Sequence, residues 1–211
     1  MVSVRTFLIG IIVAFSAFFV LDNYFSYPIF LNIFICYILV FITMYIASLF
    51  SIHTTRNMTK LEKLFRKNRK HLYYSFVHAL SNKDDKRVIT SYRKLIKRKK
   101  YQSQFALFTI LFSLYFGKTL GLREEAEKIK QLEIKSYYLA LINIEESQFK
   151  EAKKIITTIT KKWMKEALLA EIALKKGEDE VAKKHAKSAL KHTKGIQYYV
   201  LKKGYEREFA L

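Results

Sequence analysis

The hydrophobic and polar positions divide the chain into an apolar segment, residues 1–55, and a following segment with helical periodicity. The apolar segment contains two uncharged runs, residues 6–21 and residues 23–55, the second of which is uncharged when His53 is neutral. A helix needs about 20 apolar residues to cross a bilayer, a length that the second run exceeds and that the first approaches when it is counted from Met1. We therefore predict an N-terminal transmembrane helical hairpin in residues 1–55.

The distribution of basic residues predicts how this hairpin is oriented. The connection between the two predicted membrane spans, residues 22–27, contains no Lys or Arg, whereas residues 56–70 contain seven. Cytoplasmic flanks of membrane spans carry the excess of Lys and Arg. We therefore expect a multi-pass protein of the cell (plasma) membrane with both termini in the cytoplasm.

Beyond the apolar segment, apolar residues recur at the period of a helix. Between residues 56 and 80 they would share one helix face, and this helix either continues from the second span or restarts just beyond it. Asp84 and Asp85 are typical of a helix start, and the helix that follows would end at the basic run Lys97–Lys100. The positions on the first of these faces are Met58, Leu61, Phe65, Leu72, Phe76 and Leu80.

Residues 105–116 are almost wholly apolar and allow two interpretations. A third membrane span would place everything after it outside the cell. However, the uncharged run around them, residues 101–117, is only 17 residues long and includes five Gln, Ser and Thr residues. This length fits a buried core helix better than a membrane span.

An internal repeat with a 30-residue offset occupies the second half of the chain. Aligning residues 137–161 with residues 167–191 gives seven identities in 25 positions. The turns recur as well, because Gly121, Ser147 and Gly177 each precede an alanine by five residues. A small turn residue lets the chain reverse, and the alanine lets the two helices of a pair pack closely. We therefore predict an all-α chain that ends in a stack of helix pairs.

The segments ALINIEESQFKEAKKII and ALLAEIALKKGEDEVAKKHAKSAL resemble tetratricopeptide repeats. Leu169 and Ala170 occupy the leucine and small-residue positions of the first helix, and Ala182 and Ala189 occupy the two alanine positions of the second. The offset of 30 differs from the family's 34, and the tryptophan-like residue and the terminal proline are missing. The resemblance implies an α-helical solenoid in which residues 196–211 form the capping helix.

The same resemblance implies a groove for a protein segment, because tetratricopeptide stacks bind along the concave face lined by the first helix of each pair. Tyr137 and Leu141 have an alternative role, which is to seal one helix pair against the next. The groove candidates are Tyr137, Leu141, Glu145, Glu171 and Lys175.

The predicted organisation has three parts: the hairpin at residues 1–55, basic juxtamembrane helices at residues 56–100 and the repeats at residues 101–211. Two membrane spans followed by such repeats are similar to the N-terminal plan of the HemY family of bacterial membrane proteins. This second resemblance concerns architecture alone. The abundance of Lys, Ile, Phe and Tyr is also typical of an AT-rich bacterial genome.

The net charge of +20 lies entirely beyond residue 55 and is concentrated in residues 56–100, where 16 Lys and Arg face three acidic residues, a net of +13. A basic segment beside a membrane gains about 1 kcal/mol per Lys or Arg from anionic lipid, so anionic lipid head-groups are one predicted partner. Nucleic acid is the rival, because Tyr92 and Tyr101 flank a basic run and would stack on bases. The candidate contacts are Lys60, Lys63, Arg66, Lys67, Arg69, Lys70, Arg93, Lys97, Arg98, Lys99 and Lys100.

The sequence offers little catalytic chemistry. Gly117-Lys118-Thr119 lacks the first glycine of a P-loop, since position 112 is Phe112. The two histidine pairs with a spacing of seven lie about 10 Å apart along a helix, too far to share one metal. A single cysteine, Cys36, excludes an intramolecular disulfide. We expect no enzyme, no cofactor and no metal site.

These observations favour a membrane-anchored adaptor or scaffold that presents a basic helical-repeat domain at the cytoplasmic membrane face to bind a protein partner. Two alternatives stay open. One is a membrane-tethered protein that binds nucleic acid or anionic lipid, and the other is an accessory or immunity-type membrane protein that acts through its spans.

Overall fold

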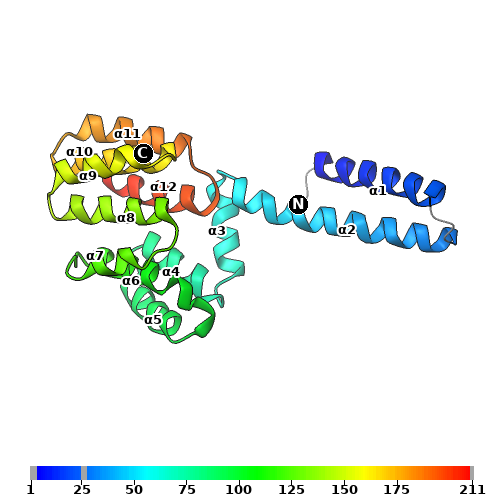
Figure 1. Ribbon diagram of the computed structural model, residues 1–211, viewed down its shortest axis with the longest axis horizontal. Coiled ribbons are helices and arrows are strands. Elements are labelled where there is room, and N and C mark those ends of the chain that lie inside the picture. Colours follow the sequence, from blue (N-terminus) through cyan, green and yellow to red (C-terminus); the bar gives the residue numbers. More distant parts are fainter. Residues whose placement is uncertain (1–3, 25–27, 210–211) are drawn as a thin grey trace. The chain divides into compact units, whose positions relative to one another are not determined.

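The computed structural model describes residues 4–24 and 28–209, and their regular elements are all helical, without a strand (Figure 1). In part of the N-terminal region it describes the backbone alone, at residues 4–10, 14, 22, 24, 44 and 46–53. The all-α class predicted from the sequence is confirmed for these residues.

The chain divides into two compact units, Met1–Thr55 and Arg56–Leu211. In the first unit, called here the N-terminal hairpin, α1 (Val4–Tyr24) packs against α2 (Ile29–Thr54). Helix α1 continues through residues 22–24, the first half of the predicted connection, and residues 25–27 lie outside the described residues.

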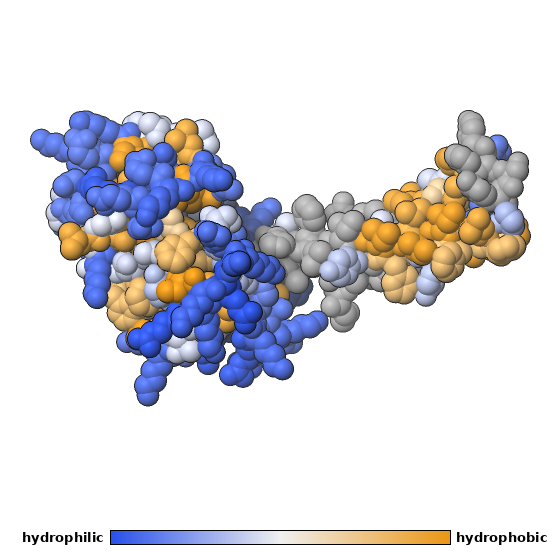
Figure 2. Space-filling view, turned by 60° about the horizontal axis from the view of Figure 1, so that its bottom comes forward, coloured by the Kyte–Doolittle hydropathy of each residue, from blue (hydrophilic) through white to orange (hydrophobic). Residues whose placement is uncertain are grey.

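The described side chains of the N-terminal hairpin expose apolar surface, which appears orange in Figure 2. Within the described part of the chain, no helix combines the length and the hydropathy that a membrane crossing requires. The exposed apolar side chains include Ile12, Phe15, Phe19, Phe30, Ile33, Phe34 and Phe41.

The second unit, called here the helical unit, is built from paired helices (Figure 1). Helix α4 pairs with α5, α6 with α7, α8 with α9, and α10 with α11. The elements are α3 (Met58–Lys67), α4 (Leu72–Ser81), α5 (Asp85–Ile96), the 3-10 helix η1 (Lys99–Gln104), α6 (Phe105–Tyr115), α7 (Leu122–Glu127), α8 (Leu132–Glu145), α9 (Phe149–Thr158), α10 (Lys162–Lys175), α11 (Asp179–Lys191) and α12 (Gly195–Phe209).

The prediction of one continuous helix between residues 56 and 80 is wrong, because the chain breaks into α3 and α4. Helix α3 starts after Asn57, whose side chain accepts a hydrogen bond from the backbone N–H of Lys60 at 3.0 Å. It ends at Asn68, whose side-chain amide donates to the carbonyl of Leu64 at 2.9 Å and so competes with helix continuation. The break lets α3 and α4 face each other instead of forming one long rod.

The starts and turns that the sequence predicted for the later helices are confirmed. The Asp84 carboxylate accepts a hydrogen bond from the N–H of Arg87 at 3.1 Å and caps α5. Gly121, Ser147 and Gly177 all have a left-handed backbone, with φ of 73°, 59° and 74°. This conformation reverses the chain between the helices of a pair, and glycine adopts it without strain.

Helix α6 is a core helix, as its length predicted. It has 11 residues and packs against α5 and α7. Phe108 and Ile110 are almost completely buried in two different hydrophobic clusters of the helical unit. The apolar character of residues 105–116 therefore reflects burial inside this unit.

Helix α12 does more than cap the last repeat, the role predicted for residues 196–211, of which residues 210–211 lie outside the described residues. It contacts α11 and also α3 and α4, from the other end of the helical unit. Ile196 and Tyr199 pack in one cluster with Leu61 and Phe65. The row of helix pairs therefore closes on itself.

Polar contacts join the same ends of the helical unit. The hydroxyl of Tyr199 donates to the Glu62 carboxylate at 2.7 Å and accepts from the side-chain amide of Asn82 at 3.0 Å. Arg56, the first residue of the helical unit, donates to the carbonyl of Thr193 at 2.8 Å, directly before α12. These bonds fix the closure in one register.

Replacing Tyr199 with phenylalanine tests this closure. Tyr199→Phe keeps the buried ring but leaves Glu62 and Asn82 short of a partner, so we expect the free energy of unfolding to fall by about 1 to 2 kcal/mol. Urea unfolding of the full chain in neutral detergent measures this change. Tyr198→Phe is the matched control, because Tyr198 packs on the same cluster and its hydroxyl makes no hydrogen bond within the described residues. An equal loss of unfolding free energy in both variants would contradict the idea that the hydrogen bonds of Tyr199 stabilise the closure.

Candidate anion-binding pocket

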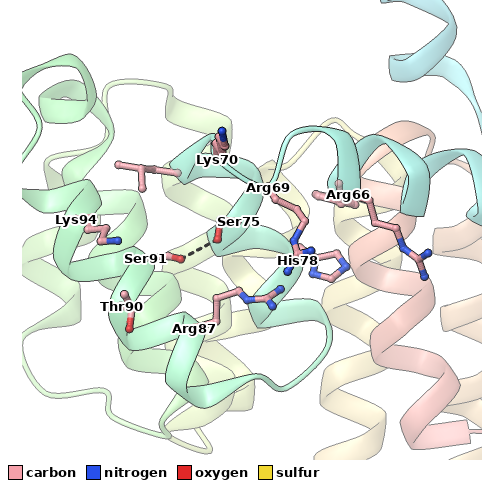
Figure 3. Close-up of a pocket in the computed structure, with 11 residues that line it drawn as sticks. Arg66, Arg69, Lys70, Ser75, His78, Arg87, Thr90, Ser91 and Lys94 are labelled. Carbon is pink, nitrogen blue, oxygen red and sulfur yellow. Dashed lines mark hydrogen bonds between the residues drawn. The ribbon is translucent and has the colours of Figure 1, made fainter.

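A cavity of about 670 Å³ lies between α3, the turn that follows it, α4 and α5 (Figure 3). Its wall carries five permanent positive charges, three hydroxyl groups and one imidazole. No Asp or Glu lines it. The charged side chains are Arg66, Arg69, Lys70, Arg87 and Lys94, and the neutral polar ones are Ser75, His78, Thr90 and Ser91.

Local structure explains why these side chains meet. Leu61 and Phe65 bury the apolar face of α3, so the basic residues at its end lie on the opposite, open side. On α5, Arg87, Thr90 and Lys94 follow one another at helical spacing and share one face. The two helices are held together through α4, which brings both basic faces to one concavity.

The positive charges of this pocket are largely uncompensated. Among the described residues, Arg66, Arg69, Lys70 and Lys94 make no ion pair. Arg87 pairs with Asp84, one turn earlier on the same helix, at 3.3 Å.

Several lysines of the later helices, in contrast, form ion pairs with glutamates. Most of these pairs lie within one helix or join neighbouring helix pairs. Lys154 lies 2.8 Å from Glu151, and Lys175 lies 2.7 Å from Glu145. Among the described residues, nine of the 21 Lys and Arg residues beyond residue 100 form an ion pair, whereas only one of the five pocket cations does.

Two serine hydroxyls lie within the pocket. The Oγ atoms of Ser75 and Ser91 are 3.0 Å apart, and Ser91 is buried (Figure 3). Because the pair shares one hydrogen bond, one hydroxyl hydrogen remains to be donated to a further oxygen acceptor. Neutral donors beside guanidinium groups suit an anion that has several oxygen atoms.

His78 connects the pocket to the closure of the helical unit. Its Nε2 lies 3.1 Å from the Glu62 carboxylate, which also accepts the Tyr199 hydroxyl. Burial opposes ionisation of Glu62, but the hydrogen bonds from Tyr199 and His78 and the charges of His78 and Lys203 lower its pKa overall. Ionised Glu62 therefore holds Tyr199 of α12 and the Nε2 atom of His78, and it does not line the pocket.

The structure separates the basic residues predicted from the sequence into several places. Arg66, Arg69 and Lys70 line the pocket, whereas Lys97, Arg98 and Lys99 line a second concavity of about 600 Å³ with Lys128 and Lys130. Lys63 borders a smaller hollow beside Glu62, and Lys100 lies over the ring of Tyr101. Lys60, Lys67 and Arg93 are exposed.

Sequence reasoning missed six polar residues of the pocket: Ser75, His78, Arg87, Thr90, Ser91 and Lys94. The spacing of Arg87 and Lys94 on α5 was a visible signal, but their convergence with α3 depends on the break between α3 and α4.

The five groove candidates lie on α8 and α10, and the structure brings them close to one another. Leu141 packs on the hydrophobic cluster between these helices, and Lys175 pairs with Glu145. Tyr137 contacts the ring of Trp163 and also packs with Tyr205 of α12. The chain's own last helix therefore covers part of the predicted groove.

Glu171 is half-buried on this covered side. Burial, together with the carboxylates of Glu145 and Glu208, raises the pKa of Glu171 to about 7, although Lys175 opposes the shift. The side chain therefore exchanges a proton near neutral pH while α12 is packed.

Comparison with known proteins gives no relative: no protein family model, curated protein or solved structure matches this chain. Among the described residues, no group of three or more His, Cys, Asp or Glu side chains is arranged to hold a metal ion. The cationic and hydroxyl side chains of the pocket make an anion the ligand that suits it best.

The raised pKa of Glu171 predicts a pH-dependent stability. The unfolded chain loses this proton at about pH 4.5, so the free energy of unfolding falls as the pH rises from there to about 7, and the full penalty applies above pH 7. Glu171→Gln removes the charge, and we expect it to stabilise the protein at pH 8.5 by on the order of 2 kcal/mol, and little at pH 5. Denaturant unfolding at both pH values measures the difference. Glu178→Gln in an exposed turn is the control, and an equal gain there would contradict the role of burial.

Proposed function

We propose that this protein is a non-enzymatic adaptor anchored in the cell membrane, with the basic face of its helical unit held against anionic head-groups and its paired helices presented to a protein partner. The observation that carries the proposal is the excess of uncompensated positive charge in residues 56–100, beside an uncharged run that ends at Thr55.

The anchor is supported by the sequence and by the exposure of the N-terminal hairpin. Residues 23–55 lack charge when His53 is neutral, and large apolar side chains of both helices are exposed, such as Phe15 at 76 % and Phe30 at 72 %. Apolar surface in water is unfavourable by about 25 cal/mol per Å², so this hairpin favours an apolar phase. We propose that residues 1–55 place both termini on the cytoplasmic side.

Contact with lipid head-groups is favoured over nucleic acid by the state of the flanking tyrosines. Stacking on bases needs a free ring face. The ring of Tyr92 stacks on Phe112 with centroids 4.0 Å apart, and the ring of Tyr101 packs edge-on against Phe108. Basic side chains without free stacking partners suit a surface of head-groups better than a single strand of nucleic acid.

The adaptor role draws on the resemblance to tetratricopeptide stacks. The part of the groove available to a protein segment is the charged end at Glu145 and Lys175, because α12 covers Tyr137. A substitution at Tyr137 would therefore disturb packing, and substitutions at Lys175 are the better probe of a partner.

The anchor is tested by extraction of membranes that contain the full chain. We expect the protein to stay with the membrane pellet in alkaline carbonate, because apolar burial does not depend on salt or pH. Phe34→Arg with Phe41→Arg places two charges in the apolar hairpin and should release a large fraction, since a charge at mid-membrane is unfavourable by about 3 kcal/mol. Lys150→Arg with Lys153→Arg is the neutral control. Release of the unaltered chain would overturn the anchor.

The proposed lipid face, the surface around Lys97, Lys99 and Lys100, is tested by measuring how close the helical unit lies to the bilayer. A fluorophore on Ser103→Cys, in a Cys36→Ser background, should be quenched by head-group acceptors more strongly in anionic than in neutral vesicles, and high salt should remove the difference. Lys97→Gln, Lys99→Gln and Lys100→Gln together should reduce this quenching.

The matched control for the lipid face removes the same charge from exposed lysines elsewhere, as Lys150→Gln, Lys153→Gln and Lys162→Gln. We expect it to leave the quenching unchanged. The same quenching in neutral and anionic vesicles would rule out the proposed face.

A further inference from the structure

We propose that the pocket between α3, α4 and α5 is a selective binding site for a phosphomonoester group. This goes beyond the diffuse contact with head-groups proposed above, because it assigns one concave site and one chemical class of ligand. The proposal rests on Arg69 and Arg87, which extend into the pocket beside the Ser75–Ser91 pair, and on the further cations of its wall (Figure 3).

The first argument is the charge of the pocket. Five cationic side chains share one concavity without a lining carboxylate, and Asp84 partly neutralises Arg87 alone. Like charges held together repel one another, and an anion between them removes this repulsion. A ligand with a single negative charge would leave most of the positive charge of the pocket uncompensated. A phosphomonoester carries about −1.5 to −2 at pH 7 and is a better match.

The second argument is the geometry of the donors. Guanidinium groups bind phosphate oxygens in pairs, and three of them line this pocket, one each from α3, the turn that follows it and α5. In Figure 3, Arg69 and Arg87 extend toward His78, and Lys94 lies on the side of the Ser75–Ser91 pair. Hydroxyl and guanidinium donors on several sides surround a tetrahedral anion, whereas a planar carboxylate would use only some of them.

The third argument is size. The cavity of about 670 Å³ falls within the usual range of small-molecule pockets and exceeds the needs of a bare ion. The ligand is therefore a phosphate attached to a larger group. Two sources share this chemistry: a lipid with a terminal phosphate, and a soluble phosphorylated molecule. Helix α3 begins at Met58, close in the chain to the end of α2 at Thr54, which makes the lipid source the natural first probe.

The experiment uses the full chain in neutral detergent, where no lipid surface attracts it. Native mass spectrometry counts the molecules of phosphatidic acid, a phosphomonoester, and of phosphatidylglycerol, a phosphodiester, bound at equal concentration. We expect phosphatidic acid to bind about tenfold more tightly. Pyrophosphate is an anhydride, but each of its ends is a terminal phosphate group like that of a monoester; titrated by calorimetry, it probes the soluble source and should compete with phosphatidic acid.

The pocket variant is Arg69→Gln with Lys94→Gln. Neither side chain makes an ion pair among the described residues, and both are exposed, so their loss should leave folding intact. We expect affinity for phosphatidic acid or pyrophosphate to fall about tenfold or more, since charge-assisted hydrogen bonds are lost. The control, Lys150→Gln with Lys153→Gln, removes the same charge from α9 and should change affinity less than about twofold.

The outcomes separate this site from the proposed lipid face. Selective binding of phosphatidic acid that only the pocket variant loses supports the site with a lipid ligand, and the same result with pyrophosphate alone supports it with a soluble one. Equal binding of the two lipids, or equal losses in both double variants, overturns the site but leaves the vesicle quenching unaffected. Pocket-dependent binding of a single-stranded oligonucleotide, with neither phosphate probe bound, would overturn it in favour of nucleic acid.

Discussion

The packing of α12 against α3 and α4 is the contact on which the shape of the helical unit depends. Helix α3 contacts only α4 and α12 extensively within the described residues, so its position is set largely by the last helix of the chain. Phe65 and Tyr199 form the apolar part of this contact, with ring centroids 4.6 Å apart, and Glu62 forms the polar part. Because Arg66 directly follows Phe65 and Arg69 lies in the turn after α3, the C-terminal helix also fixes this basic wall of the pocket.

The same helix explains why the predicted groove is only partly open. Tyr205 is buried against α10, and burial of its ring stabilises this contact, although its buried hydroxyl has no hydrogen-bond partner among the described residues and offsets part of the gain. Leu201 and Phe209 add to this gain. The penalty of ionising Glu171 above pH 7 is on the order of 2 kcal/mol, smaller than the combined apolar gain. Helix α12 therefore stays packed at neutral pH despite the carboxylate beneath it.

The sequence predicted those features that depend on neighbouring residues. The cap at Asp84, the left-handed turns at Gly121 and Gly177 and the core role of residues 105–116 follow from local chemistry and run length. The break at Asn68 was missed because the apolar period continues across it, and only the competing amide of Asn68 marks the end of α3. The pocket was missed for a related reason: Arg69 and Arg87 meet only once α3 folds back on α4.

The two halves of the helical unit, residues 56–100 and residues 101–211, differ in how many of their basic side chains form ion pairs. Lys154 and Lys183 each pair with a glutamate three residues earlier, and such exposed pairs contribute little to stability. Among the five pocket cations only Arg87 makes such a pair within the described residues, and the mutual repulsion of the five charges works against the folded state. A ligand that binds only the folded state stabilises it by mass action, so an anion in the pocket would tighten the packing of α3 and, through Glu62 and Tyr199, that of α12. An anion bound in the pocket would therefore be coupled to closure of the helical unit through His78, Glu62 and Tyr199.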